Sequence, residues 1–254
     1  MIDCGNTPDF DPIDVLIEYN LIPGVNGRPQ LSQLILTNYD QDHFSGLPGL
    51  RSKVYIRSVI FAKNLSSIEI KLIKPTITRA VTAVCEIKEE YINDLPNTYT
   101  PPFKTHCFTL SKNEFTTSPS TNDLSQLVFI DYNGFVICVP GDLEHEGWRL
   151  MLQKPEVCSL LSRTKLFVAS HHGRENGYVE GVFKFCAPEV IVISDKSLVH
   201  DTQDGMAQDY ASQVSGNGIL VHSQRRKVLT TRSDGHILVN VDSKGSATYN
   251  TIRF

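Results

Sequence analysis

Three features that would place the chain in a specialised class are missing. No stretch approaches the roughly 18 consecutive apolar residues of a membrane-spanning helix, and the N-terminus has no basic segment followed by an apolar one. The six cysteines are scattered without a Cys-x-x-Cys pair, as is typical of small reduced core residues in a cytosolic protein. These absences predict a soluble, cytoplasmic protein with no membrane partner.

An excess of either charge is missing as well. Lys and Arg number 24 against 28 Asp and Glu, which gives a formal net charge of -4. The chain as a whole therefore exerts no electrostatic attraction on nucleic acid or an anionic membrane. A phosphate-bearing substrate would have to be attracted locally, by a metal or by a few basic residues. Composition leaves the oligomeric state open.

Short apolar runs bounded by turn residues recur along the chain and predict buried strands. A chain of 254 residues that is 41% hydrophobic is long enough to bury one full core, so we expect one domain spanning residues 1–254. The predicted strands are 34–36, 54–56, 127–130, 135–139, 166–169 and 190–193, and helices are expected at about 147–152, 155–161, 179–185 and 204–214. This alternation indicates layered α/β architecture.

Turn signals organise the rest of the chain. Asn133-Gly134 between two apolar runs predicts a β-hairpin over 127–139. The segment 96–122 is rich in Pro, Thr, Ser and Asn and predicts a long irregular loop. After Gly216 only strands are expected, at 218–221, 227–231, 237–241 and 247–252, with Asp234-Gly235 as a second hairpin turn.

The segment 37–47 places four metal-competent side chains directly after a predicted strand: Asn38, Asp40, Asp42 and His43. Asp and His suit zinc or manganese, and positions 38, 40 and 42 point the same way on an extended loop. An equally weighted alternative is a solvated turn in which Asp40 and Asp42 cap the following helix.

Three further motifs follow other predicted strands. Asp142 ends the run 135–139, as either a turn residue or a ligand. His171 and His172 stand before Gly173; two adjacent imidazoles do not both fit easily in a core, and glycine permits close approach of a metal. His200 comes after the run 190–193 and is a weak signal alone. We expect all four motifs at one edge of a common sheet.

This combination resembles the metallo-β-lactamase superfamily, whose His-x-His-x-Asp-His signature is followed by a distant Gly-Asp and further histidines. It is most similar to the soluble hydrolase domain of ComEC-type competence proteins, in which Asp takes the middle position of the first motif, an acidic stretch like 143–147 follows the Gly-Asp, and His-His-Gly closes the next strand. The resemblance covers residues 2–203. It implies an α/β fold, a four-layer αβ/βα sandwich of two mixed sheets with flanking helices. The usual N-terminal opening hairpin is expected to be missing, which leaves a strand edge near residues 1–5.

The resemblance also implies roles. Asp42 and His43 resemble ligands of the second metal site, and Asp142 the carboxylate that bridges two metals or closes one. His171 or His172 would be a ligand or a proton-transfer group, and His200 would lie near the substrate. The candidate catalytic residues are thus Asp42, His171, His172 and His200. His106 is a weaker candidate, since 122–125 resembles the Asn-x-x-Ser element of ComEC-like relatives.

Two departures weaken the first metal site. Asn38 stands where the superfamily places its first histidine, and Asp40 where most members place the second. Asparagine is a poor zinc ligand, and oxygen ligands alone favour manganese or magnesium. We therefore expect one divalent ion, zinc or manganese, to bind tightly and a second to bind more weakly.

The expected activity is metal-dependent hydrolysis, by a phosphodiesterase or nuclease acting on nucleic acid or nucleotides. The ion would lower the pKa of water toward about 7 and polarise the electrophile. Arg174, Lys196 and the basic run 225–227 are candidates for neutralising phosphates, although such a run is more often a solvated turn. Two alternatives stay open: a catalytically weakened binding or sensor module of the same fold, and a hydrolase of acyl substrates such as lactams or thioesters.

Overall fold

The computed structural model describes residues 1–25, 27–91, 101–195 and 205–253. The chain divides into two compact units, Met1–Thr100 and Pro101–Phe254. Both contain helices and strands, so the α/β class expected from the sequence is confirmed. The single domain spanning 1–254 stays a prediction. Within the described ranges, no helix combines the length and hydrophobicity needed to cross a membrane.

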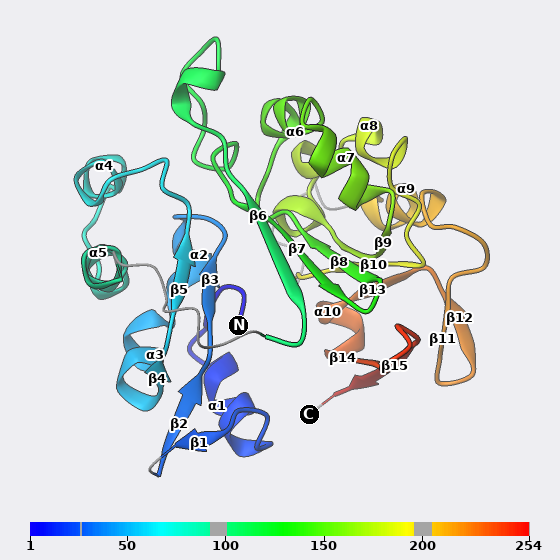
Figure 1. Cartoon of the computed structure of the whole chain (residues 1–254), viewed down its shortest axis with the longest axis horizontal. Helices are drawn as coiled ribbons and strands as arrows, with labels where there is room; N and C mark the ends of the chain where they lie inside the picture. Colours follow the sequence, from blue (N-terminus) through cyan, green and yellow to red (C-terminus); the bar gives the residue numbers. More distant parts are fainter. Residues whose placement is uncertain (26, 92–100, 196–204, 254) are drawn as a thin grey trace. The chain divides into compact units, whose positions relative to one another are not determined.

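A six-stranded mixed sheet forms the centre of the second unit (Figure 1). The strand order is β13-β10-β9-β8-β7-β6, in which the first four strands run parallel and the last three alternate in direction. The strands are β6 (Lys104–Phe108), β7 (Leu127–Tyr132), β8 (Phe135–Val139), β9 (Thr164–Val168), β10 (Val190–Ile193) and β13 (Val228–Thr230). Parallel pairing brings the carboxyl ends of β8, β9 and β10 to one edge.

Both faces of this sheet are covered, which explains why its parallel strands read as continuous apolar runs. Successive residues of a strand point to opposite faces, so Phe167 packs in one core and Leu166 in the other. The first core includes Trp148, stacked on Phe167 with ring centroids 6.2 Å apart. It lies under α6 (His145–Met151), α7 (Pro155–Leu161), α8 (Glu180–Phe183) and α9 (Met206–Ser212). These four helices confirm the four predicted in this region.

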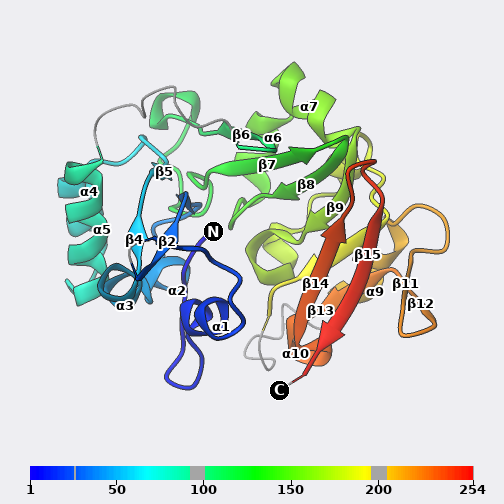
Figure 2. The same cartoon turned by 60° about the horizontal axis from the view of Figure 1, so that its bottom comes forward.

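The second core lies beneath two antiparallel hairpins, as Figure 2 shows for β14 and β15. The hairpins are β11 (Ile219–Val221) with β12 (Gln224–Arg226), and β14 (His236–Val241) with β15 (Ala247–Ile252). The β7–β8 hairpin predicted from the sequence is confirmed as well. Its turn residues Asn133 and Gly134 have φ of 50° and 85°, and the favoured two-residue turn requires a positive φ at both positions.

Two expectations for the second unit are wrong. The segment 96–122 is not all loop, because β6 pairs with β7 along its length and a 3₁₀ turn, η1 (Lys112–Glu114), follows. As an edge strand that is only partly buried, β6 lacks the apolar pattern of the central strands. Asp234-Gly235 is not a hairpin turn either. Helix α10 (Thr231–Asp234) ends at this point. The strands on either side of it do not pair with each other, because β13 pairs with β10 and β14 pairs with β15.

In its described residues, the first unit has short strands, most of them paired in parallel, and five helices. Two parallel pairs, β2 with β4 and β3 with β5, confirm the predicted strands 34–36 and 54–56. The elements are α1 (Pro12–Glu18), β1 (Gly24–Val25), β2 (Arg28–Leu31), β3 (Leu34–Leu36), α2 (Gln41–Phe44), α3 (Leu47–Lys53), β4 (Tyr55–Ile56), β5 (Val59–Phe61), α4 (Ser67–Ile73) and α5 (Arg79–Glu90). At the start of the chain, the Asp3 N–H donates to the Ile35 carbonyl, and the Ile35 N–H to that of Met1.

The sequence contains local signals for helix α5. Thr78 accepts a hydrogen bond from the Val81 N–H and caps the helix, and the buried positions include Ala80, Val84 and Ile87. This is the spacing of one helix face. The helix presents Lys88 to the loop before α2.

Lys88 supports that loop through Tyr39. Its ammonium donates to the Tyr39 hydroxyl at 2.8 Å and to the Ala62 carbonyl at 3.1 Å, and its Nζ lies 4.1 Å from the centroid of the Phe61 ring. Burial, together with the nearby Lys63, lowers the pKa of Lys88 to about 8. The folded state therefore loses this proton at lower pH than the unfolded chain does.

We predict a pH-dependent effect of Lys88→Met on stability. Between pH 8 and about 10.5, the unfolded chain holds the Lys88 proton and the folded state does not, so Lys88 contributes a rise in stability with pH that the variant lacks. Urea unfolding at pH 7 to 10 should show the wild type gaining stability relative to the variant above pH 8. The exposed lysine Lys71, changed to Met, is the control and should give a flat difference. A constant difference for Lys88→Met would contradict the assignment.

Candidate metal centre

The second unit brings Asp142, His171 and His172 together at the carboxyl edge of its parallel strands. Asp142 follows β8, and the two histidines follow β9. Their backbones are linked, since the His171 N–H donates to the Gly141 carbonyl at 3.1 Å. Asp142 and the two histidines thus follow neighbouring strands of one sheet, as expected. The motif at 38–43 follows β3, which pairs with β5 in a separate two-stranded sheet, so the expectation of one common sheet is wrong for this motif. His200 and Lys196 lie outside the described residues.

Both histidines have left-handed backbone conformations. The turn η2 (Ser170–Gly173) holds His171 at φ 50°, ψ 49° and His172 at φ 55°, ψ 28°. Each such residue costs about 1–3 kcal/mol and persists only where its surroundings enforce it. Here Ser170 is fully buried, donates to the Leu143 carbonyl at 2.6 Å and accepts from Trp148 Nε1 at 3.2 Å. Strained residues of this kind cluster at functional sites.

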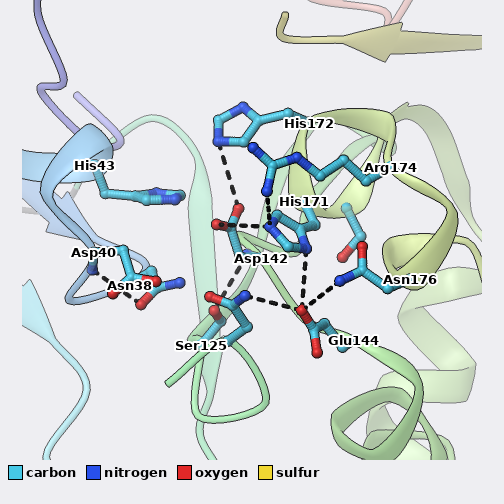
Figure 3. Close-up of polar contacts among 12 residues, drawn as sticks. Asn38, Asp40, His43, Ser125, Asp142, Glu144, His171, His172, Arg174 and Asn176 are labelled. Atoms are coloured by element: carbon cyan, nitrogen blue, oxygen red, sulfur yellow. Dashed lines mark hydrogen bonds and ion pairs between the residues drawn. The ribbon is translucent and has the colours of Figure 1, made fainter. Parts of the chain in front are cut away.

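The carboxylate of Asp142 faces both imidazoles (Figure 3). It is 3% exposed, and Ser125 Oγ accepts a hydrogen bond from its backbone N–H. Its Oδ1 lies 3.8 Å from His172 Nε2 and its Oδ2 lies 4.0 Å from His171 Nε2. These distances are too long for hydrogen bonds. They do not exceed the sum of two metal–ligand bonds of about 2 Å each, so one ion can reach a carboxylate oxygen and an imidazole nitrogen together.

His172 has the tautomer of a metal ligand. Its Nδ1 lies 2.8 Å from the carbonyl oxygen of Ser194, in the loop after β10. A carbonyl only accepts, so Nδ1 carries a ring proton, and Nε2 is the nitrogen that faces Asp142. Metal-binding histidines are commonly oriented by such a bond from the opposite ring nitrogen.

His171 is held from both sides of its ring. Arg174 Nη1 donates to its Nε2 at 2.9 Å, and its Nδ1 lies 3.2 Å from Glu144 Oε1. The same Glu144 oxygen accepts hydrogen bonds from the side-chain amides of Asn122 at 2.9 Å and Asn176 at 2.7 Å. The two asparagines therefore hold the Glu144 carboxylate in the position from which it contacts the His171 ring.

Burial lowers the pKa of His171 and favours its neutral imidazole. The carboxylate of Asp142 raises the pKa, the positive charge of Arg174 lowers it, and the carboxylate of Glu144 raises it. The lone pair of the neutral ring on Nε2 accepts the hydrogen bond from Arg174.

In the first unit, Asp42 and His43 lie on the short helix α2. The predicted extended loop is therefore wrong at these two positions, since the chain turns into a helix after Asp40. Asp42 is exposed and His43 is buried, with its Nδ1 2.9 Å from Asp3 Oδ2. Thr37 fixes that carboxylate, because its N–H and its hydroxyl both donate to it. Asp3 thus orients His43 in the way that ligating histidines are oriented.

Asn38 and Asp40 have other partners. Asn38 Oδ1 accepts hydrogen bonds from the backbone N–H groups of Tyr39 and Asp40. Asp40 stands at the N-cap position of α2, but its side chain makes no capping bond, so the capping alternative does not describe it. Its carboxylate instead binds Lys74 Nζ at 2.5 Å.

Sequence reasoning missed Asp3 and Lys74 because they are 40 and 34 residues from their partners. The strand-like opening of the chain is a weak signal for Asp3, whereas Lys74 has none. His106 lies on the edge strand β6, and with Glu156 and Arg163 it lines a surface hollow of about 680 Å³.

The Asn-x-x-Ser element does contact the candidate centre. Asn122 binds Glu144, and Ser125 binds the backbone of Asp142. This favours 122–125 over His106 as the element that supports the site. In the basic run, Arg226 is paired with Asp234 and Arg225 donates to the Gly218 carbonyl, so both have structural partners.

No family model matches the chain, and no curated protein matches it either. A buried carboxylate, two imidazoles and one guanidinium at a strand edge are suited to hold a divalent cation and an anionic group.

We predict that Gly177→Ala disturbs the histidine turn. A Cβ at residue 177 would lie 2.4 Å from the Ser170 carbonyl oxygen and 2.9 Å from the His171 Cβ. We expect a loss of about 1–3 kcal/mol in urea unfolding, typical of overpacking, and changed His171 ring shifts in NMR spectra. Gly181→Ala is the control, since its Cβ would meet only ordinary contacts beyond 3.5 Å. Unchanged shifts and stability in Gly177→Ala would show that this close approach does not position His171.

Proposed function

We propose that the protein is a metal-dependent hydrolase of the metallo-β-lactamase type, similar to ComEC-type hydrolase domains and acting on phosphodiesters of nucleic acid or nucleotides. The observation that carries the proposal is the pair of left-handed histidines facing the buried carboxylate of Asp142. The proposal includes the four-layer sandwich, of which the mixed sheet and its flanking helices are the described part.

The donor set fits a divalent ion. A carboxylate with imidazole ligands suits zinc or manganese, and His172 has its Nε2 directed at Asp142. His171 is the second imidazole, either as a ligand or as a proton-transfer group between Arg174 and Glu144. The resemblance assigns Asp42 and His43 to the same metal chemistry, and the Asp3–His43 pair supports the assignment for His43.

An ion held there would lower the pKa of a water molecule and polarise the bond to be cleaved. The residues of the chain contribute the rest. Asp142 and the histidines would hold the ion, and Glu144 and Ser194 orient the histidine rings. Arg174 places a guanidinium beside His171, where it would bind the oxygens of a charged substrate. Because the net charge is -4, this local positive charge favours a phosphodiester over an uncharged acyl substrate.

A second candidate is a binding or sensor module of the same fold that has lost turnover. The observations that favour it are the backbone bonds of Asn38 and the ion pair between Asp40 and Lys74, which occupy two of the expected ligands. Metal binding without hydrolysis would support this candidate.

We predict that Asp142→Asn abolishes both tight metal binding and hydrolysis. The substitution keeps the side-chain volume but removes the charge shared by the two imidazoles. Metal content after reconstitution with zinc or manganese, and the rate with bis(p-nitrophenyl) phosphate, should each fall at least about 100-fold, by the loss typical of a catalytic metal ligand or its support. Asp209→Asn, on the exposed face of α9, is the control. Wild-type rates in Asp142→Asn would reject the catalytic assignment, and normal metal content without any hydrolysis in the wild type would favour the sensor module.

We predict that Asp3→Asn weakens metal binding by about 10- to 100-fold, the usual cost of losing the group that orients a ligating histidine. The asparagine keeps the size of the side chain and can still accept from Thr37, so the effect should be on His43 rather than on folding. Isothermal titration with zinc or manganese measures the affinity, and circular dichroism checks the fold. Asp9→Asn, an exposed change in the same unit, should leave affinity unchanged. Equal affinities for Asp3→Asn and the wild type would remove His43 from the ligand set.

A further inference from the structure

A lysine is bound to one of the expected ligands of the first metal site. Lys74 directly follows α4, and its Nζ lies 2.5 Å from Asp40 Oδ1. The Lys74 side chain is 13% exposed and that of Asp40 is 33% exposed, so the pair is largely shielded from solvent. A shielded pair is screened less by water and salt than a surface pair, and a competing cation displaces it less easily.

The other expected ligand of that site is also bound within the protein. Asn38 is 2% exposed, and its Oδ1 accepts from the backbone N–H groups of Tyr39 and Asp40. These bonds fix the turn that leads into α2. If Asn38 were to bind a metal through this oxygen, the turn would lose both of them.

His43 contrasts with these two residues. Asp3 accepts a hydrogen bond from His43 Nδ1. A bond of this kind keeps the lone pair on Nε2 and strengthens the imidazole as a ligand. Asp40 has a cation as its partner, and a cation competes with metal binding. In the first unit, His43 is therefore oriented as a metal ligand would be. Asn38 and Asp40 instead have partners within the protein.

We propose that the ammonium of Lys74 takes the place of the first metal ion, so that the protein binds a single divalent cation. The inference rests on the proposed function, because it assumes that a metal binds at the second site. In place of the weakly bound ion that the sequence predicts at the first metal site, the protein has the positive charge of Lys74. The single positive charge neutralises Asp40, and a divalent ion at the same position would be repelled by it.

The inference predicts that two changes together restore the second ion. Asn38→His supplies the missing imidazole, and Lys74→Gln removes the ammonium while keeping a side chain that can hydrogen-bond Asp40. Asn38→His alone should still bind one ion, because Lys74 keeps Asp40 occupied. The double variant should bind two. Asn38→His with Lys74→Arg keeps the positive charge and should bind one.

The experiment measures manganese content and the electron paramagnetic resonance spectrum of the full chain after reconstitution and desalting. An isolated Mn²⁺ ion gives a six-line spectrum, whereas two close ions give a coupled one, so the spectrum reports the site without any activity assay. The matched control is Asn38→His with Lys71→Gln, which removes an exposed lysine of α4. Lys74→Met in place of Lys74→Gln provides a second test, should the first double variant not fold.

We expect one equivalent of manganese and a six-line spectrum for the wild type, and two equivalents with a coupled spectrum for Asn38→His/Lys74→Gln. Two equivalents in the wild type would overturn the inference and leave the proposed function standing. One equivalent in both Lys74-neutral double variants would also overturn it. No bound manganese or zinc in the wild type would overturn the inference together with the proposed metal-dependent function.

Discussion

The parallel pairing of β8, β9 and β10 is the constraint on which the candidate centre depends. Parallel strands end at the same edge, so the loops that follow them are forced together. Helices cover one face of the sheet and hairpins the other, which keeps the strands buried. The side chains after the strands are then placed by a rigid support, as catalytic and binding groups require.

The strain of the histidine turn depends on that support. His171 and His172 are both left-handed, and the cost is offset by the buried bonds of Ser170 and by the close approach that Gly177 permits. The same contacts set the direction of each ring. Fixed rings lose little freedom on binding a ligand, so the folding energy of the unit is used to preorganise the site.

Charge partners divide the polar side chains of the first unit into two groups. Asp3 orients the ring of His43, whereas Lys74 neutralises Asp40. The ligand types around 38–43 look alike in a list of residues, yet their neighbours give them different chemistry. The identity of a residue therefore states what it is able to bind, and the partner decides whether that capacity is used.

The sequence alone determined the features that are local in the chain. Apolar runs specified the central strands, Asn133-Gly134 specified the hairpin, and the polar residues after the strands identified Asp142, His171 and His172. Tertiary structure decided what depends on distant partners: the pairing of β6, the helix at Thr231–Asp234, and the contacts of Asp3 and Lys74. The physical reason is range. Propensity and periodicity act over a few residues, whereas an edge strand, a carboxylate–histidine pair or a half-buried ion pair exists only after folding brings residues tens of positions apart into contact.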